Sequence, residues 1–353
     1  ALALRLCWSS SKPEAAMNDP DTRAITAARA RQAFYERIDP LHLTPLWEVL
    51  AALVPKTPTP RAQPAHWAYS QVREHLMEAG RLISAREAER RVLILENPGL
   101  RGASRITQSL YAGLQLILPG EVAPAHRHTQ SALRLVLDGQ GAYTAVDGER
   151  TTMRRGDFII TPAWTFHDHG CGGDEPVVWL DGLDIPLVEF LGAGFPEKAV
   201  ADVQGQARPE GDAQARYGHN LVPVDYAPAP NEPTRLFVYP YTQTRAALDG
   251  IARGPIDAHH GFKLRYVNPA TGASPMPTIG ACVQRLPAQG GELFLGRFRQ
   301  ALRLGAEAGA VERVAQQRVS PVGHVHANLV GTAGTWPKSN KSNLFMSAIN
   351  NIK

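Results

Sequence analysis

The chain has 353 residues, of which 44% are hydrophobic and 20% are charged, so its composition is that of a globular protein and excludes a disordered or fibrous chain. Its length exceeds the ~250 residues at which single cores usually stop growing, which predicts two domains. The net charge of +4 comes from scattered arginines without a dense basic block, and this argues against nucleic acid as a partner.

Two further features of the composition narrow the class. No segment approaches the ~20 consecutive apolar residues of a membrane-spanning helix, so we expect no membrane partner. The three cysteines, Cys7, Cys171 and Cys282, are far apart and odd in number. They argue against a disulfide framework and favour a reducing, cytoplasmic location.

Helical patterns dominate the first 95 residues. Apolar residues recur at helical spacing from about 21 to 52, and a Pro-rich run from Val54 to Pro64 ends this segment. A second helical pattern covers about 69–89 and leads into RVLILEN, which predicts a short strand. We therefore expect residues 1–95 to form an N-terminal helical arm.

From 96 to 200 the pattern changes to short apolar runs separated by glycine, proline and aspartate. Runs such as ALRLVLDGQG, DFIITPAWTF and VVWLDGLDI recur at intervals of about ten residues, which is typical of an antiparallel sandwich or barrel. The DG pair in VDGER predicts a tight hairpin. This segment therefore predicts the first β domain.

The remaining residues divide into a connector and a second β unit. Residues 201–255 are rich in Pro, Gly and Ala with little periodicity, and we expect them to wrap over a neighbouring domain. Residues 256–353 begin with strand-like runs, but their composition becomes atypical after about 288. We therefore predict a second β domain whose barrel is incomplete.

Histidines cluster in the first β segment. His126 and His128 lie two residues apart in an expected strand, so both side chains point to the same face. The spacing G-x5-H-x-H there is followed by G-x5-P-x4-H, which ends at His167 and predicts a three-histidine metal site. A divalent ion held by three neutral imidazoles keeps its charge and has open positions for an anionic, chelating substrate and dioxygen.

These paired spacings resemble the two motifs of the cupin superfamily, in which the first supplies two metal ligands and the second supplies one. The glutamate ligand that many cupins place after HxH is missing here, since Ser131-Ala132-Leu133-Arg134 stands in its place. With HGFKLRYVNPATG added, the chain resembles gentisate 1,2-dioxygenases from about residue 30 to 288. That family consists of mainly β bicupins related to salicylate and 1-hydroxy-2-naphthoate dioxygenases.

The resemblance implies Fe(II), one per cupin site, and O2-dependent ring opening of gentisate (2,5-dihydroxybenzoate) to maleylpyruvate in aromatic compound catabolism. By position, it makes Arg90 and Arg134 catalytic. The arginines would bind the substrate carboxylate or orient the chelate, which suits a planar, permanently charged guanidinium. His169 lies two residues beyond His167 and could face the same cavity, so it is a further catalytic candidate as acid, base or hydrogen-bond donor. The further substrate-binding residues that it implies are Gln115, Gly113, Tyr111 and Asp181.

Purely structural roles remain open for these residues: surface salt bridges for the arginines, barrel packing for Tyr111 and an acidic residue in a turn for Asp181. His169 could instead lie behind the ligands or exchange roles with His167. The second HxH pair, His324 and His326, has no partner histidine after it, and we interpret it as a decoy.

Three other functions also remain open. A non-catalytic metal- or ligand-binding cupin is one, and the two arginines and His169 around an unsaturated metal site argue against it. A Zn or Mn isomerase is another, and the missing carboxylate ligand argues against that. The substrate could also be salicylate or 1-hydroxy-2-naphthoate. The family resemblance implies a homotetramer.

Overall fold

The computed structural model describes residues 20–57, 59–228, 233–257, 261–285, 326–329 and 344–350. The chain divides into two compact units, Ala1–Thr59 and Pro60–Lys353. In the described ranges, no helix has both the length and the apolar character that a bilayer span requires.

The first unit is helical. Its elements are α1 (Pro20–Ile38), η1 (Asp39–Leu41) and α2 (Leu46–Leu53). Pro40 has no backbone N–H to donate to the Glu36 carbonyl, so the α-helical hydrogen-bond series ends and the chain continues as η1. The helical character predicted for about 21–52 is confirmed.

The second helical pattern is two helices rather than one. α3 covers Tyr69–Leu82, and α4 covers Ala85–Ala88. The Ser84 hydroxyl oxygen accepts the backbone N–H of Glu87 at 3.2 Å, which caps a new helix and so interrupts the predicted span. β1 (Val92–Ile94) follows where RVLILEN predicted a strand. Residues 69–94, which the sequence pattern placed in the N-terminal arm, belong to the compact unit Pro60–Lys353.

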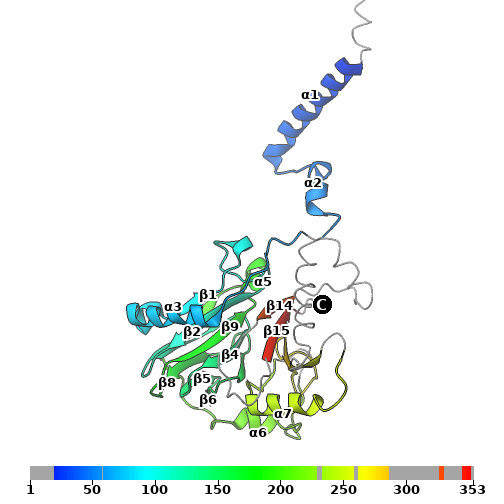
Figure 1. The fold of residues 1–353 in the computed structure, drawn as a ribbon. Coiled ribbons are helices and arrows are strands. Elements are labelled where there is room, and N and C mark those ends of the chain that lie inside the picture. The colour runs from blue at the N-terminus through cyan, green and yellow to red at the C-terminus, as the bar shows by residue number, and fades with distance from the viewer. Residues whose placement is uncertain are drawn as a thin grey trace, which may run out of the picture. The chain divides into compact units, whose positions relative to one another are not determined.

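Two antiparallel sheets form a barrel that confirms the predicted, mainly β cupin architecture (Figure 1). The first sheet has the order β1, β2 (Tyr111–Ile117), β9 (Val177–Leu183), β4 (Ala132–Asp138), β7 (Phe158–Thr161), β11 (Val238–Tyr239). The second has the order β10 (Pro196–Lys198), β3 (Val122–His128), β8 (His167–Cys171), β5 (Ala142–Val146), β6 (Glu149–Thr152). Strands distant in sequence therefore lie side by side.

The predicted hairpin at VDGER is confirmed between β5 and β6. Its two central residues, Asp147 and Gly148, both have positive φ, at 50° and 74°. This is the backbone of a type I′ turn, whose twist matches that of the flanking strands. A Cβ at Gly148 would also lie 2.7 Å from that of Ala207, so glycine is required twice over.

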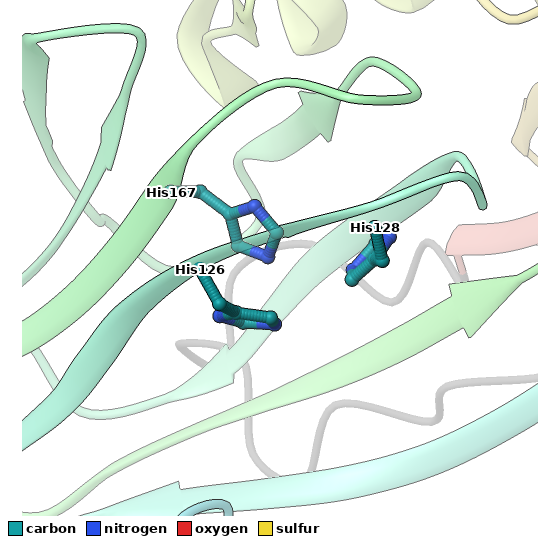
Figure 2. A group of neighbouring side chains, drawn as sticks. All are labelled: His126, His128 and His167. Carbon is teal, nitrogen blue, oxygen red and sulfur yellow. The ribbon is translucent and has the colours of Figure 1, made fainter. Parts of the chain in front are cut away.

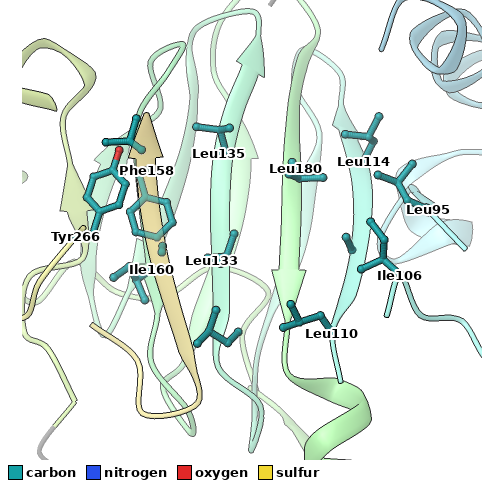
Figure 3. Packing of buried hydrophobic residues seen from close by; sticks show 14 of the residues in the cluster. Leu95, Ile106, Leu110, Leu114, Leu133, Leu135, Phe158, Ile160, Leu180 and Tyr266 are labelled. Atoms are coloured by element: carbon teal, nitrogen blue, oxygen red, sulfur yellow. The ribbon is translucent and has the colours of Figure 1, made fainter. Parts of the chain in front are cut away.

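The first sheet is buried on both faces, which explains why its strands have continuous apolar runs. Leu133 and Leu135 of β4 point outward into a cluster (Figure 3) that includes Leu76 of α3 and Tyr266 of the second β unit. The Phe158 and Tyr266 rings stack with centroids 4.4 Å apart. The opposite face lines the barrel, where an apolar cluster fills one end: Ile117, Val136, Ala142, Met153, Ile159, Cys171, Val177 and Trp179.

The predicted connector contains more regular structure than its composition indicated. After α5 (Ile185–Phe190) and β10, it forms α6 (Asp212–Tyr217), β11 and α7 (Tyr241–Ile251). α6 and β11 are too short to produce a readable periodicity. The segment does run along the barrel, since Gln204 Nε2 donates to Asp168 at 2.9 Å and the Ala213 N–H donates to Glu149 at 3.1 Å.

The second β unit has a four-stranded sheet with the order β12 (Phe262–Arg265), β13 (Ile279–Arg285), β15 (Leu344–Asn350), β14 (His326–Leu329). Two of these strands come from the segment of atypical composition. Most of the segment after residue 285 lies outside the described residues, so the incomplete second barrel stays a prediction. His324 is among those undescribed residues, and of His326 only the backbone in β14 is described.

Candidate metal centre

Three histidines from neighbouring strands meet at one end of the barrel. His126 and His128 lie on β3, and His167 begins β8 directly opposite His126 in the antiparallel register. One nitrogen from each ring lies within 4.8 Å of the other two, and Figure 2 shows the three rings around a common space. The predicted i, i+2 pairing on a strand therefore brings the expected residues together.

Backbone carbonyls fix the tautomers of two of these rings. His128 Nδ1 lies 2.8 Å from the carbonyl oxygen of Gln130, and His167 Nδ1 lies 3.0 Å from that of Thr165. Because a carbonyl only accepts hydrogen bonds, each Nδ1 carries the proton and each Nε2 keeps its lone pair. That is the arrangement in which a histidine binds a metal through Nε2.

His126 has two competing neighbours at Nδ1. The Pro124 carbonyl oxygen lies 3.3 Å away, and Arg90 Nη2 lies 2.5 Å away. Arginine only donates, so its contact needs an unprotonated Nδ1, whereas metal binding through Nε2 needs Nδ1 protonated toward Pro124. Arg90 therefore has to leave His126 Nδ1 when this ring binds a metal.

Burial keeps all three imidazoles neutral. It lowers the pKa of His126 to about 3 and that of His128 to about 4, with smaller effects of nearby arginines and histidines. Burial, followed by the Arg134 charge, also lowers the pKa of His167 well below its ordinary value. Neutral imidazole is the form that ligates metals, so three preorganised nitrogen donors fit a divalent transition metal.

Three predicted substrate-binding residues form one row across the first sheet. Arg134 of β4 pairs with Asp181 of β9, which pairs with Gly113 of β2. Arg134 Nε lies 3.3 Å from Asp181 Oδ1, and Arg134 Nη1 donates to the Thr161 hydroxyl at 2.5 Å. The exposed fractions of Arg134 and Asp181 are 4% and 6%. The surface salt bridge and the turn acid are therefore excluded for this pair.

The other predicted residues of β2 flank this row. Gln115 lies opposite Trp179 and is buried, and Tyr111 is half-buried at the start of the strand. A Cβ on Gly113 would lie 3.0 Å from the Tyr111 hydroxyl oxygen and 2.5 Å from Val92 Cγ1. Glycine at this position thus makes room for the Tyr111 side chain.

His169 lies deeper in the barrel than the three-histidine group. It is 1% exposed, and its ring centroid lies 5.8 Å from that of His167 and 5.3 Å from that of Trp179. Among the described residues, the group that could hold a metal contains His167 and not His169. The geometry therefore separates the roles of the two rings, which the sequence left exchangeable.

Several polar atoms around His169 have unfilled hydrogen-bonding capacity. In the described part of the chain, four buried atoms without a partner in good hydrogen-bond geometry are Arg134 Nε, His169 Nδ1, Trp179 Nε1 and Asp181 Oδ1, although the Trp179 indole is close enough to the Asp181 carboxylate to lower its pKa. Arg134 and Asp181 are ion paired, but these two atoms miss hydrogen-bond geometry. Buried polar groups of this kind are normally satisfied, so their concentration marks a place for a polar ligand or water.

Sequence reasoning missed two residues of this region, Trp179 and Thr161. Trp179 precedes Asp181 by two residues on β9, so both side chains lie on the same face of the strand. The alternation of side chains along a strand could therefore have identified Trp179. Thr161 ends β7 next to Pro162 of the second motif, but its contact with Arg134 depends on the pairing of β4 with β7. Nothing in the local sequence indicates that pairing.

The charges near the three-histidine group are perturbed by burial. Burial raises the pKa of Asp181 to about 6, and the Arg134 guanidinium opposes this shift. Burial lowers the pKa of Arg90 to about 10, and Arg134 adds to the effect. Burial also raises the pKa of Tyr111, with a smaller effect of Asp181. The carboxylates of Asp181, Glu89 and Asp168 each raise the pKa of Arg90 and so partly offset this lowering.

Comparisons with known proteins agree with this arrangement. The cupin domain family model matches residues 113–183. A gentisate 1,2-dioxygenase of Aquipseudomonas alcaligenes is 51% identical over 269 residues, covering 76% of this chain and 77% of the relative, and one from a Ralstonia species is 43% identical, covering 68% and 67%.

The fold of a solved ring-cleaving enzyme matches as well. Salicylate 1,2-dioxygenase of Pseudoaminobacter salicylatoxidans, in a structure with gentisate, has a TM-score of 0.67 and 33% identity, covering 80% of this chain and 76% of that chain. These identities and coverages show that the chain shares the fold and the family of these proteins, as the sequence motifs had indicated. The chain belongs to the gentisate 1,2-dioxygenase family of ring-cleaving cupin enzymes.

Proposed function

We propose that this chain is an Fe(II)-dependent gentisate 1,2-dioxygenase that converts gentisate and O2 to maleylpyruvate in the catabolism of aromatic compounds. The observation that carries the proposal is the three-histidine group of His126, His128 and His167 next to buried polar atoms without partners. A structural metal site has its coordination closed by the protein and needs no such neighbouring groups.

The neutral ligand set favours this chemistry. His126, His128 and His167 would hold iron through three neutral imidazoles, so the ion would keep its full charge and would supply Lewis-acid and redox chemistry for an anionic, hydroxyl-bearing substrate and dioxygen. Holding both reactants at one centre replaces a three-body encounter with a fixed geometry. The protein's own residues then decide how the aromatic acid is oriented.

The two arginines are proposed to bind the substrate carboxylate. Arg134 is held by Asp181 and Thr161, so its position is fixed before substrate arrives. Arg90 Nη1 donates to the Glu89 carbonyl oxygen at 3.0 Å and Nη2 to the Pro124 carbonyl oxygen at 2.6 Å. These bonds keep the Arg90 guanidinium beside His126, and its donor capacity now directed at His126 Nδ1 would pass to an anion when that ring binds the metal. A planar guanidinium matches the two oxygens of a carboxylate.

The remaining predicted residues are proposed to surround the ring. His169, whose Nδ1 has no partner in the described structure, would donate to or accept from a substrate hydroxyl. Gln115 offers an amide from β2, Tyr111 and Gly113 shape the same strand, and Asp181 holds Arg134 in place. A hydroxyl-bearing substrate thus meets polar partners, whereas a purely apolar ligand would leave them unpaired.

Iron-dependent turnover tests this proposal. The protein is loaded anaerobically with Fe(II), mixed with gentisate and O2, and followed by the absorbance of the ring-opened product. His126→Ala should abolish product formation, whereas Arg127→Lys, on the same strand between the two ligands, should retain it. Iron binding without turnover of gentisate would contradict the proposal and favour a non-catalytic metal-binding cupin.

Salicylate and 1-hydroxy-2-naphthoate are the alternative substrates, since solved relatives include a salicylate 1,2-dioxygenase. Parallel assays with each acid decide between them, with gentisate expected to have the highest kcat/KM.

We also propose a cytoplasmic homotetramer. The described cysteines, Cys171 and Cys282, are buried thiols, which suits a reducing compartment. A monomer in light scattering would contradict the assembly.

A further inference from the structure

A buried carboxylate lies behind the metal ligand His128, separated from it by a single peptide group. His128 Nδ1 donates to the Gln130 carbonyl oxygen at 2.8 Å, and the Ser131 N–H donates to Asp184 Oδ1 at 2.9 Å. The Gln130 C=O and the Ser131 N–H belong to the same peptide bond. The carboxylate, the peptide and the imidazole therefore form one continuous hydrogen-bonded line.

This line is shielded from solvent. Asp184 is 2% exposed and Ser131 is 1% exposed, so the carboxylate acts on the peptide without competition from bulk water. Asp184 also occupies the N-cap position of α5, where an aspartate side chain usually accepts a helix N–H, yet its side chain makes no capping bond. Its carboxylate is instead used by the Ser131 peptide.

The second β unit holds the far side of the same carboxylate. The Thr278 hydroxyl donates to Asp184 Oδ2. Thr278 directly precedes β13, and its neighbours Met276 and Ile279 are buried in the cluster on the outer face of the first sheet. The packing of the second β unit on the first sheet therefore fixes where the Thr278 hydroxyl lies.

We infer that Asp184 is a positioning residue for the metal ligand His128, and that Thr278 couples the second β unit to the metal centre through Asp184. Metal-ligating histidines commonly donate their second ring nitrogen to a carboxylate or a carbonyl, which orients the ring and raises the basicity of the ligand nitrogen. Here the Gln130 carbonyl accepts the hydrogen bond of His128 and orients its ring. The Asp184 carboxylate accepts from the N–H of the same peptide group, and hydrogen bonds on both sides of one amide strengthen each other.

The inference rests on the proposed metal site, but it concerns metal affinity rather than turnover. It gives the second β unit a role in the reaction centre without supplying a ligand. Thr129 is held by the carbonyl oxygens of Phe195 and Ala193, whereas the Ser131 N–H is held by Asp184. Without Asp184 the Gln130–Ser131 peptide would lose this anchor, and the Gln130 carbonyl could rotate away from His128. Loss of that hydrogen bond would leave the His128 ring free to change its tautomer and direction.

Co(II) binding tests the inference independently of dioxygenase activity. The dissociation constant is measured by competition with a chromogenic chelator, and the visible absorption of bound Co(II) reports its coordination geometry. Asp184→Asn keeps the side-chain shape but removes the charge, and we expect its affinity to fall about tenfold, the lower end of the usual effect of such partners. Thr278→Val, which removes only the hydroxyl, should weaken binding and change the Co(II) spectrum.

Two further variants separate positioning from folding. Thr278→Ser restores the hydroxyl and should bind Co(II) as the wild type does. Thr244→Val removes a hydroxyl of α7 that lies 3.4 Å from that of Tyr266 in the second β unit, and it should leave affinity unchanged. Equal Co(II) affinity and spectra for wild type and a folded Thr278→Val would overturn the inference, as would a loss of affinity that Thr278→Ser does not restore.

Discussion

Arg134 and Asp181 face each other on β4 and β9, with Nε and Oδ1 3.3 Å apart, and both side chains are almost completely buried. Removing one partner of such a pair leaves an uncompensated charge in the barrel, whereas replacing both by apolar residues does not. We therefore expect that replacing both residues costs less stability than replacing one, whereas turnover of gentisate is lost in either case.

Arg134→Met is predicted to lower the free energy of unfolding by roughly 3–5 kcal/mol, because the Asp181 carboxylate loses its partner. Adding Asp181→Leu should recover most of this loss, while gentisate turnover stays absent in both variants. Urea denaturation of the metal-free proteins measures the effect. If the double variant were as unstable as the sum of the single ones, the two side chains would not interact as described.

The pH dependence of stability should show the titration of Asp181. Its pKa is raised to about 6 from an unfolded value of ~3.9, so the folded state binds the proton more tightly. The contribution of Asp181 to stability is therefore largest at low pH and is lost as pH rises through about 6.

Asp181→Asn, which cannot titrate, isolates this effect. The free energy of unfolding of the wild type minus that of Asp181→Asn is predicted to fall between pH ~4 and the raised pKa, and to stay level above it. Chemical denaturation of both metal-free proteins across this range supplies the comparison. A difference that rises with pH would mean that the Arg134 charge outweighs burial.

Metal removal is predicted to destabilise the protein. A metal that binds the folded state alone, at 100 times its dissociation constant, adds about 2.7 kcal/mol to the free energy of unfolding. Treatment with a chelator should therefore lower the melting temperature, and metal should restore it. His128→Ala serves as the control and should melt at one temperature with or without metal; a metal-dependent shift in that variant would place the ion elsewhere.

A substitution of Arg127 tests which side chains of β3 point toward the metal centre. It lies between His126 and His128 but donates to Glu197 at 2.6 and 3.0 Å, and its guanidinium lies 4.4 Å from the Trp164 ring centroid. Arg127→Ala should lower the free energy of unfolding by about 1 kcal/mol through these half-exposed contacts while metal stoichiometry remains one per chain. Loss of metal from a folded Arg127→Ala would show that Arg127 belongs to the metal centre.

Local sequence was sufficient for the features that depend on strand alternation and turn chemistry. His126 and His128 face the same way because they are two residues apart on β3, and the Asp147-Gly148 turn follows from its residue types. The family resemblance supplied the rest of the expected group, and the strand register brings Arg134, Asp181 and Gly113 into one row.

Other features depend on long-range pairing that local patterns do not contain. The hydrogen bond of Thr278 to Asp184 joins residues 94 positions apart, and Thr161 meets Arg134 only because β7 pairs with β4. The short elements α6 and β11 were missed because few residues give no periodicity. Such contacts are decided by tertiary packing.

Oxygen labelling tests whether this chain is a ring-cleaving dioxygenase. The Fe(II)-loaded protein is given gentisate under ¹⁸O2, and the product is analysed by mass spectrometry at short reaction times. We expect one O2 to be consumed per gentisate and both labelled oxygen atoms to appear in the ring-opened product, with no product formed by His126→Ala. Iron-loaded protein that leaves gentisate intact, or product with a single label, would contradict the assignment as a ring-cleaving dioxygenase.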